Sequence, residues 1–512
     1  MILALNDLTG ASLYSRRHPE KIWATSGIAY QGKLKSLEIT VTHRLELILQ
    51  INGIIAARQL FMHDVTAHQL RCADKTADIS GKMLLPKTKT CKVVVNPDST
   101  YQEMLGFGGI TIPTAYQSLS EQGKKQWWKI IREYNLLIHR EYPIGQKLRR
   151  TMDNWDHPEN ATVHYYGDNF PNSEISDFEY IKKIQDMGGT NVFEFWKLPL
   201  WVQTPTDIDI DLYAKSMVAY CKTAKEKTGC APGIVGIQNE TSQPDSIWYL
   251  MVLKLRAGLD EAGFKNIKIH MHNAPNLAKG IDAARSFTGN PQVWAVIDYS
   301  AVNMYDYQDY LANPDGYDHL MREFRELTAD KPFLSTEISV NRSNLQIHSY
   351  KLAFQMGQLY HKNLTISNAS AIIYCWALLN NVQYSYNMSR SLFGVDELNG
   401  FIPAPFGFQD RVFGGFSRRV LKGMRRMDVQ SGDSDLLSVA FISPNHTHRT
   451  LILMNRGTCP MELQIEGISG FNWQEKTSQY YRNVASEVKG EVTIQPGEII
   501  TLTNVPLGGY KL

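Results

Sequence analysis

Gly233-Ile-Val-Gly-Ile-Gln-Asn-Glu240 and Pro332-Phe-Leu-Ser-Thr-Glu337 are two short segments that run apolar and end in a glutamate. An apolar run of this length bounded by Gly or Pro is typical of a strand that is buried on both faces. Strands of this kind occur in parallel sheets whose faces are covered by helices. These two segments therefore predict an α/β protein in which each of these two strands ends in a glutamate.

The same alternation of strand and helix signals continues from about residue 100 to 425. Ser118-Leu-Ser-Glu121 reads as a helix-capping box, and Trp127, Ile131 and Tyr134 follow it at helical spacing. Eight buried strands that alternate with helices over about 250 residues or more indicate a (β/α)8 TIM barrel, which we place at residues 91–427. The predicted strands are Met104–Ile110, Leu136–Gly145, Thr190–Trp196, Gly233–Asn239, Ile267–Asn273, Val296–Tyr305, Phe333–Glu337 and Ala371–Leu378.

The two ends of the chain differ in character from this central tract. Residues 428–512 contain short alternating runs divided by Gly, Pro and Asn, which predict a C-terminal antiparallel β-sandwich. These runs are Leu436–Ile442, Thr450–Asn455, Met461–Glu466, Glu491–Gln495 and Glu498–Thr503. Residues 1–90 form a β-rich N-terminal extension of unknown role, with a hairpin predicted around Asn52-Gly53.

Composition excludes several classes of protein. Hydrophobic residues make up 43% and charged residues 20% of the 512 residues, and the net charge is only +2, so neither a nucleic-acid nor an anionic-membrane partner is indicated. No apolar run approaches the roughly 20 residues of a membrane-spanning helix. Because the sequence as given lacks a signal peptide, it predicts a cytoplasmic protein, or a secreted or periplasmic one if the N-terminus is truncated.

The cysteines do not suggest a metal site. The six residues are scattered and show no CxxC spacing, so we predict no metal and no dense disulfide framework. Cys221 and Cys230 are near enough in sequence to bridge, but we favour two unpaired thiols in the core.

The paired glutamates suggest a specific chemistry. Barrel enzymes place their reacting residues at the carboxyl ends of strands, and here Glu240 ends the fourth predicted strand and Glu337 the seventh. Glycosidic bond cleavage uses two such carboxylates, which lie about 5–5.5 Å apart for retention or about 6.5–9.5 Å apart for inversion of configuration. Desolvation and a second carboxylate raise the pKa of an acid residue. The alternative for either glutamate is a structural ion pair.

Four motifs resemble glycoside hydrolase family 30. They are Leu105-Gly-Phe-Gly-Gly109, Gly236-Ile-Gln-Asn-Glu240, Ser335-Thr-Glu337 and Phe416-Ser-Arg-Arg419. The resemblance covers roughly Cys91 to the C-terminus and implies a retaining clan A enzyme. It makes Glu240 the acid/base and Glu337 the nucleophile, and it implies a β-domain packed rigidly on the barrel. In that arrangement residues 91–100, which include Lys92–Val95, would add a strand to the β-domain.

The chain departs from the family pattern on loops that face the substrate. Thr241 stands where proline commonly follows the acid/base, and Trp196-Lys-Leu-Pro-Leu-Trp201 replaces the usual Ser-Pro-Trp. Arg140-Glu-Tyr-Pro-Ile-Gly145 matches its counterpart only loosely. The implied substrates are β-1,6-glucan, β-1,6-galactan, xylan or glucuronoxylan, and glycosylceramide, and the sequence does not choose among them.

Three polar residues are candidates for substrate binding beside the glutamates. The Asn239 amide is placed to donate to a sugar 2-hydroxyl, a contact that strengthens as charge builds in the transition state. In the family a strand-six tyrosine orients the nucleophile, which points to Tyr305. Arg140 would hold Glu337 ionised by charge pairing. The alternatives are a loop-bonding amide, a core tyrosine and a structural ion pair.

Aromatic and histidine side chains complete the candidate site. Trp376, Trp196 and Trp201 are candidate stacking platforms for sugar rings, or else packing residues. His270 and His272 have the spacing of one strand face, but no third ligand accompanies them, so we predict hydrogen-bonding roles and place only His272 at the substrate.

The predicted function is a retaining β-glycosidase that acts on a β-linked glycan or glycoconjugate by double displacement and needs no cofactor. Its partner is the carbohydrate substrate, and the oligomeric state stays open. One alternative is a glycan-binding protein on a catalytically decayed scaffold, and another is a clan A glycosidase of a different family.

Overall fold

The computed structural model describes residues 88–141, 177–196, 198, 202–203, 207–305, 313, 315–340, 350–380, 391–405 and 407–506, together with the backbone of strands within residues 2–71. Contacts divide the chain into an N-terminal unit, Met1–Lys87 with Asn344–Leu352, and a main unit, Thr88–Ser343 with Ala353–Leu512. Within these described ranges no helix is both long and apolar enough to cross a membrane.

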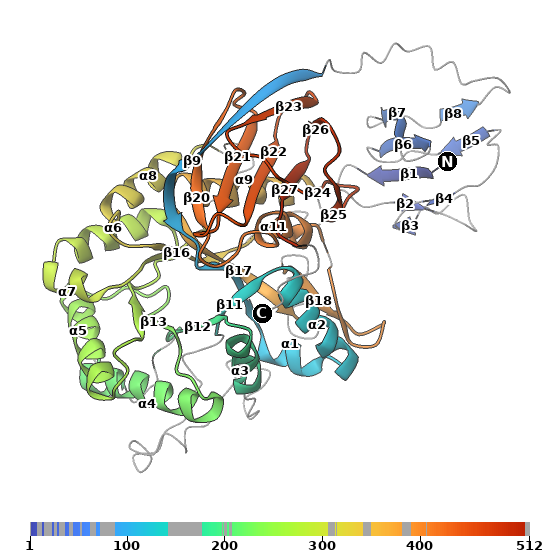
Figure 1. The fold of residues 1–512 in the computed structure, drawn as a ribbon. Helices are drawn as coiled ribbons and strands as arrows, with labels where there is room; N and C mark the ends of the chain where they lie inside the picture. The colour runs from blue at the N-terminus through green and yellow to red at the C-terminus, as the bar shows by residue number, and fades with distance from the viewer. Residues whose placement is uncertain are drawn as a thin grey trace. The chain divides into compact units, whose positions relative to one another are not determined.

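The N-terminal unit contains three small antiparallel sheets (Figure 1). The predicted hairpin is confirmed, because β6 and β7 pair antiparallel with Ile51 opposite Ile54. The four-stranded sheet has the order β4 (Ile28–Ala29), β1 (Ile2–Asp7), β6 (Leu45–Ile51) and β7 (Ile54–Phe61). The two-stranded sheets are β2 (Leu13–Tyr14) with β3 (Trp23–Ala24), and β5 (Ser36–Ile39) with β8 (His68–Arg71).

The main unit is built around a parallel barrel. Hydrogen-bonded neighbours follow the order β14-β13-β12-β11-β10-β17-β16-β15, and parallel bridges from His270 to Tyr299 and from Ala274 to Val302 join the two ends. The strands are β10 (Gly106–Thr111), β11 (Leu136–Arg140), β12 (Thr190–Phe193), β13 (Ile234–Gly236), β14 (Lys268–His270), β15 (Ser300–Asn303), β16 (Phe333–Ile338) and β17 (Ala369–Leu379). Strands β18 (Phe393–Asp396) and β19 (Ile402–Ala404) form an antiparallel pair, and β18 pairs in parallel with the end of β17.

Each of the eight predicted strands overlaps one of these, although most are shorter than predicted. The prediction for Val296–Tyr305 was wrong at its start, because Val296 ends a helix. Residues 142–145 of the second predicted strand lie outside the described residues. Gly108 and Gly109 allow close strand packing, since a Cβ at Gly108 would lie 1.9 Å from the carbonyl oxygen of Ile138.

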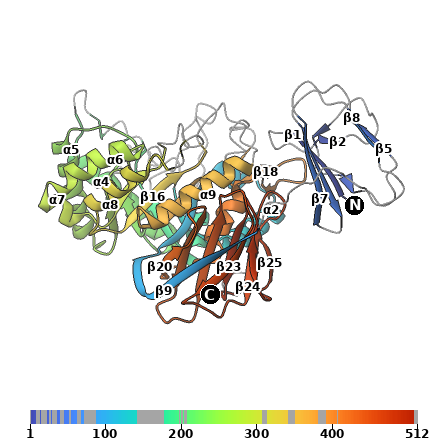
Figure 2. The same cartoon turned by 90° about the horizontal axis from the view of Figure 1, so that it is seen from above.

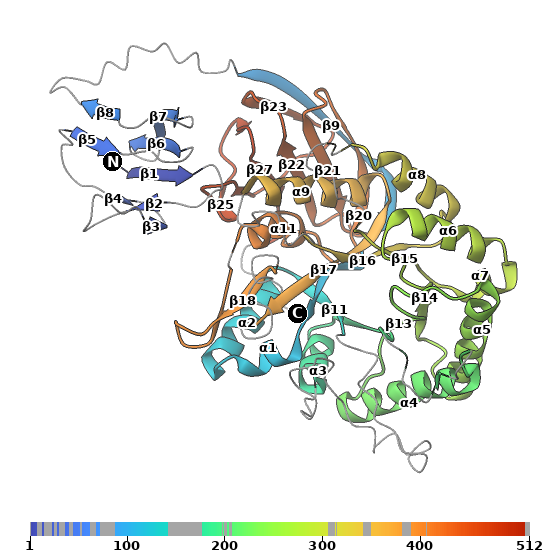
Figure 3. The ribbon, with the colours of Figure 1, turned by 180° about the vertical axis from the view of Figure 1, so that it is seen from behind.

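Helices surround the barrel strands, as Figures 1 and 3 show. The predicted capping box was wrong: the N-cap is Ser120, not Ser118, and its side chain accepts a hydrogen bond from the Gly123 amide at 3.1 Å. Trp127 and Ile131 are buried as their spacing predicts. The helices are α1 (Pro113–Ser118), α2 (Glu121–Glu133), α3 (Phe178–Asp186), α4 (Ile210–Thr228), α5 (Asp245–Glu261), α6 (Leu277–Thr288), α7 (Pro291–Val296), α8 (Asp318–Leu327), α9 (Tyr350–Thr365) and α11 (Gln409–Ser417).

A second, nine-stranded sheet combines the start of the main unit with its end. The long strand β9 (Lys89–Glu103), which includes Lys92–Val95, pairs antiparallel with β20 and parallel with β23. The other strands are β20 (Arg425–Ser431), β21 (Leu436–Ile442), β22 (Arg449–Asn455), β23 (Met461–Glu466), β24 (Trp473–Thr477), β25 (Val484–Glu487), β26 (Val492–Ile494) and β27 (Ile499–Thr503). A sandwich arrangement of this sheet and the predicted domain boundaries stay predictions.

The second sheet packs against helix α9 (Figure 2) and against α11, which contacts β24 and β27. Gly357 of α9 leaves room for Met454, whose terminal methyl would lie 2.9 Å from an added Cβ, and for Ile499. The fully buried Glu475 of β24 forms ion pairs with Arg418 and Arg419, which follow α11. The interface is therefore both apolar and ionic.

The described cysteines are free thiols. Cys221 is buried, and burial raises the pKa of its thiol above the ordinary value. Cys230 is exposed, which corrects the expectation that both thiols lie in the core.

Candidate active site

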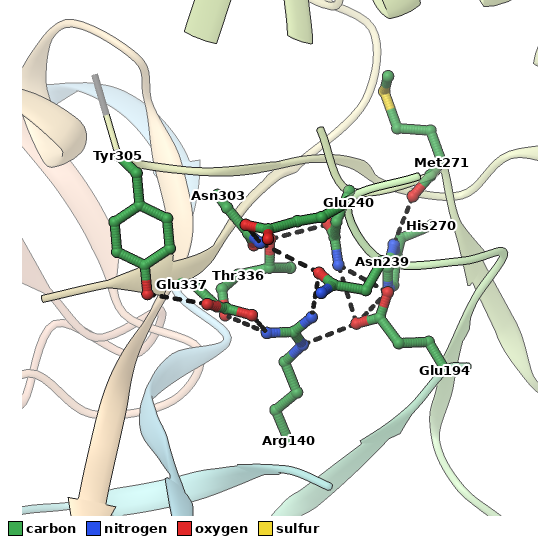
Figure 4. Close-up of polar contacts among 11 residues, drawn as sticks. Arg140, Glu194, Asn239, Glu240, His270, Met271, Asn303, Tyr305, Thr336 and Glu337 are labelled. Atoms are coloured by element: carbon green, nitrogen blue, oxygen red, sulfur yellow. Dashed lines mark hydrogen bonds and ion pairs between the residues drawn. The ribbon is translucent and has the colours of Figure 1, made fainter. Parts of the chain in front are cut away.

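Glu240 and Glu337 meet at the carboxyl end of the barrel. Glu337 lies within β16, and Glu240 follows β13 by four residues (Figure 4). The parallel arrangement of the strands delivers both carboxylates to the same rim, which is where barrel enzymes carry their reacting groups.

Glu337 is held at both carboxylate oxygens. Arg140 Nη1 donates to Oε1 in a short contact, and the Tyr305 hydroxyl donates to Oε2 at 2.8 Å. Burial raises the pKa of Tyr305 well above its ordinary value, and the charge of Glu337 adds to this effect, so the phenol keeps its proton. The two donors therefore hold both oxygens of the Glu337 carboxylate in fixed positions.

Arg140 is the only arginine or lysine in this network of described residues, and it is fully buried. Its Nε donates to Glu194 Oε1 at 2.7 Å and its Nη2 to Asn239 Oδ1 at 2.8 Å (Figure 4). The guanidinium therefore links the end of β11 to the segments that follow β12 and β13. Burial alone would lower the pKa of Arg140, but the carboxylates of Glu194 and Glu337 outweigh burial and raise it. One fixed positive charge therefore serves two carboxylates.

Glu240 is in a different environment, with no direct contact to Arg140 in the described structure. Its backbone is left-handed, with φ of 48°, and its amide donates to the Asn273 carbonyl at 2.7 Å. Asn303 Nδ2 donates to its Oε1 at 2.9 Å. The residue stays accessible to solvent, yet desolvation of its carboxyl group raises the pKa of Glu240, and the charge of Glu337 raises it further. Non-glycine residues in this conformation are uncommon, and they occur in turns as well as at functional sites.

Side-chain amides and one hydroxyl form hydrogen bonds with the residues that contact the two glutamates. Asn273 Nδ2 donates to both oxygens of Glu194 at 2.8 Å. Thr336 Oγ1 contacts the amide oxygens of Asn273 and Asn303 at 2.8 and 2.9 Å. Asn303 Nδ2 also lies 3.1 Å from Asn239 Oδ1.

Sequence reasoning missed Glu194 and did not assign Asn303 or Thr336. The available signal was position: Glu194 directly follows β12, Asn303 ends β15, and Thr336 precedes Glu337. Each is a polar residue at the end of a buried strand, the position from which barrel residues reach the active face.

The structure brings two of the three candidate tryptophans together. Trp196 and Trp376 have ring centroids 6.2 Å apart at an interplanar angle of 31°, and the Arg140 guanidinium lies 5.2 Å from the Trp196 ring. Both tryptophans are half-buried. Trp201 lies outside the described residues.

His272 makes no hydrogen bond to this network among the described residues, and its place at the substrate stays a prediction. Its ring stacks on Trp248 at 4.5 Å and on Phe287 at 6.0 Å, and burial lowers its pKa to about 4. Its ring neighbours lie on α5 and α6, whereas His270 lies near Glu194, so the two rings do not face the same side. His270 lies 3.8 Å from Glu194, and burial lowers its pKa. The described residues contain no group of three or more candidate ligands for a metal ion.

Comparisons with known proteins agree with this geometry at the level of the fold. No protein-family model and no curated protein matches the sequence, whereas many solved structures match the chain. A GH30 endoxylanase from Clostridium papyrosolvens C71 is 16% identical with a TM-score of 0.57, covering 80% of this chain and 99% of that chain. SrfJ from Salmonella typhimurium is 16% identical with a TM-score of 0.61, covering 86% and 96%. An endo-β-1,6-glucanase is 15% identical with a TM-score of 0.60, covering 80% and 94%.

The chain therefore has the fold of the family 30 glycoside hydrolases, as its sequence motifs predicted.

Proposed function

We propose that this chain is a retaining β-glycosidase that cleaves a β-linked glycan or glycoconjugate by double displacement. Glu337 is the nucleophile and Glu240 the acid/base. The observation that carries the proposal is that the two carboxylates have different hydrogen-bonding and electrostatic surroundings. Glu337 receives donors from Arg140 and Tyr305, whereas the surroundings of Glu240 raise its pKa. A pair of carboxyl groups with opposed environments is the usual basis for separate acid and nucleophile roles.

In the first step a carboxylate oxygen of Glu337 attacks the anomeric carbon, and the glycosidic bond breaks. Glu240 gives its proton to the departing oxygen, so the leaving unit departs as an alcohol. The sugar is then esterified to Glu337. In the second step Glu240 takes a proton from water, the hydroxyl oxygen attacks the anomeric carbon, and the ester bond to Glu337 breaks.

The change of role at Glu240 follows from electrostatics. The negative charge of Glu337 is one cause of the raised pKa of Glu240, and that charge disappears when the sugar is attached. The pKa of Glu240 then falls, and the residue becomes a base. Arg140 still pairs with Glu194 in this state, so the guanidinium keeps its position.

Neighbouring residues have supporting roles. Asn239 turns its amide oxygen toward Arg140 and Asn303, which leaves its NH₂ group to donate to the sugar 2-hydroxyl. Trp376 and Trp196 form an aromatic wall for the apolar face of a sugar ring, and Trp201 remains a candidate for the same role. Tyr305 and Arg140 orient Glu337.

The test is release of reducing sugar from β-1,6-glucan, β-1,6-galactan, xylan and glucuronoxylan, and of free sugar from glycosylceramide. Glu240→Gln is measured in parallel, and Glu261→Gln, an exposed glutamate that ends α5, is the matched control. Release by the wild type and by Glu261→Gln, but not by Glu240→Gln, supports the proposal. Binding of a glycan without release would favour a decayed scaffold that only binds carbohydrate.

A further inference from the structure

A cavity of about 660 Å³ lies beside Glu240, on the side of the barrel formed by the segments after β12 and β13. Gln238 and Thr241, which flank Asn239-Glu240, both line it. Further lining residues include Trp196, Gln203, Ser246 and Ile247. This volume is within the range of about 300–1,000 Å³ that is usual for small-molecule sites.

Two buried polar atoms of the cavity have no partner among the described residues. They are Gln238 Oε1 and Thr241 Oγ1. Gln238 is only 3% exposed, so water reaches its side chain poorly. A buried polar atom without a hydrogen bond costs about 1–3 kcal/mol, and such atoms are rare in native proteins. An acceptor that is left unpaired in a binding cavity is suited to an O–H donor of a ligand.

The charge of the cavity limits the kind of ligand. Its described lining residues include Asp207 but no lysine or arginine. A carboxylate or phosphate on the ligand would be desolvated there without a cationic partner, which is unfavourable. Neutral hydroxyl groups, which both donate and accept, match glutamine, threonine and serine side chains.

We propose that this cavity is the binding site for the sugar unit on the leaving-group side of the scissile bond, and that this unit is uncharged. The inference rests on the proposed function. The departing oxygen must lie within hydrogen-bond reach of Glu240, so the departing unit begins at this residue. The lining residues come from the segments after β12 and β13, whereas Glu337 and Tyr305 belong to β16 and to the end of β15, respectively.

Three of the lining residues, Thr241, Trp196 and Leu198, are at positions where this chain departs from the family pattern. Thr241 supplies an unpaired hydroxyl where proline would supply none, and Trp196 and Leu198 belong to the segment that replaces Ser-Pro-Trp. The protein therefore acts on an oligosaccharide or longer glycan with a neutral residue at this position. Among the substrates considered above, a neutral glucan, galactan or xylan fits better than a glycan with glucuronic acid at this unit.

The test blocks the cavity with Ser246→Trp. Ser246 is exposed in the first turn of α5 and is not part of the proposed catalytic machinery. Glu261→Trp is the matched control, because it lies on the same helix about 22 Å further along. For each variant, kcat/KM is measured with a β-glycosyl fluoride, whose small leaving group does not fill the cavity, and with a β-linked oligosaccharide that has the same reacting sugar.

We expect Ser246→Trp to lower kcat/KM for the oligosaccharide by about tenfold or more, which corresponds to about 1.4 kcal/mol. The glycosyl fluoride should be cleaved at the wild-type rate, and Glu261→Trp should change neither value. Thr241→Val should lower the oligosaccharide value by about two- to tenfold, as expected for one lost hydrogen bond. Equal losses on both substrates, or no loss with the oligosaccharide, would overturn the inference while the proposed function stands.

The remaining outcomes separate the two proposals. If the wild type cleaves neither substrate, the proposed function fails, and titration of the oligosaccharide by calorimetry then tests the cavity alone. Weaker binding by Ser246→Trp supports the site, and unchanged binding contradicts it. An oligosaccharide whose leaving unit is a uronic acid should be cleaved less efficiently than its neutral counterpart. Equal or better cleavage would contradict the uncharged ligand.

Discussion

Asn303→Leu tests whether Glu240 is the acid. Asn303 is fully buried at the end of β15, and its Nδ2 lies 2.9 Å from Glu240 Oε1. Leucine has nearly the same shape as asparagine and cannot donate. The other partners of Asn303 keep a hydrogen bond, since Asn239 Oδ1 still accepts from Arg140 at 2.8 Å. Thr336 likewise keeps its contact with Asn273 at 2.8 Å.

The expected effect is an increase in the pKa of Glu240. The Asn303 hydrogen bond favours the charged carboxylate, so it lowers the pKa, and its removal raises the pKa. A hydrogen bond to a charged group contributes about 1.5–3 kcal/mol, and one pH unit corresponds to about 1.4 kcal/mol. Glu240 is accessible to solvent, so water replaces part of the lost contact. We therefore expect a shift of about one pH unit, at the lower end of this range.

The assay is the pH dependence of kcat/KM with an unactivated substrate, whose leaving group needs protonation. Loss of the proton from the acid defines the alkaline limb, so this limb should move to higher pH in Asn303→Leu. Thr336→Val is the control, because Thr336 contacts Asn303 but not Glu240 in the described structure. A limb that stays in place, or moves to lower pH, would refute the assignment of Glu240. The same shift in Thr336→Val would show that the effect is indirect.

Three further predictions test other parts of the account. Glu337→Ala should abolish turnover, and azide should restore it with an inverted glycosyl azide as product; a folded variant that yields none would remove Glu337 from the nucleophile role. Deletion of residues 428–512 should leave insoluble protein in a sedimentation assay, because it uncovers the apolar faces of β9, α9 and α11; a soluble and active barrel would contradict this. A thiol reagent should label Cys230, which is exposed, and spare Cys221, whose thiol is buried with a raised pKa, as measured by mass spectrometry; the reverse pattern would contradict the structure.

Strand positions could be predicted well where the strand is apolar. Leu436–Ile442 and Met461–Glu466 match β21 and β23 residue for residue. By contrast, β24 and β25 were missed because their sequences are largely polar, and all four residues of β25 are exposed. Their position depends on backbone pairing with a neighbouring strand, for which the side-chain pattern gives no signal.

The candidate site could be predicted only in part, because its supporting contacts join distant segments. The two glutamates ended apolar runs and were visible in the sequence. Glu194 contacts Arg140 at a separation of 54 residues and Asn273 at 79, so its role depends on the closed barrel. His272 stacks on Trp248 of α5 and Phe287 of α6, contacts between separate segments that its position in the sequence does not indicate.

The central claim is retention of configuration through a glycosyl ester on Glu337. Its most direct test is proton NMR of the first sugar released from a β-linked substrate, recorded before mutarotation equilibrates the anomers. The account predicts that the β-anomer forms first. Initial release of the α-anomer would contradict it, because inversion requires water, and not Glu337, to attack the anomeric carbon.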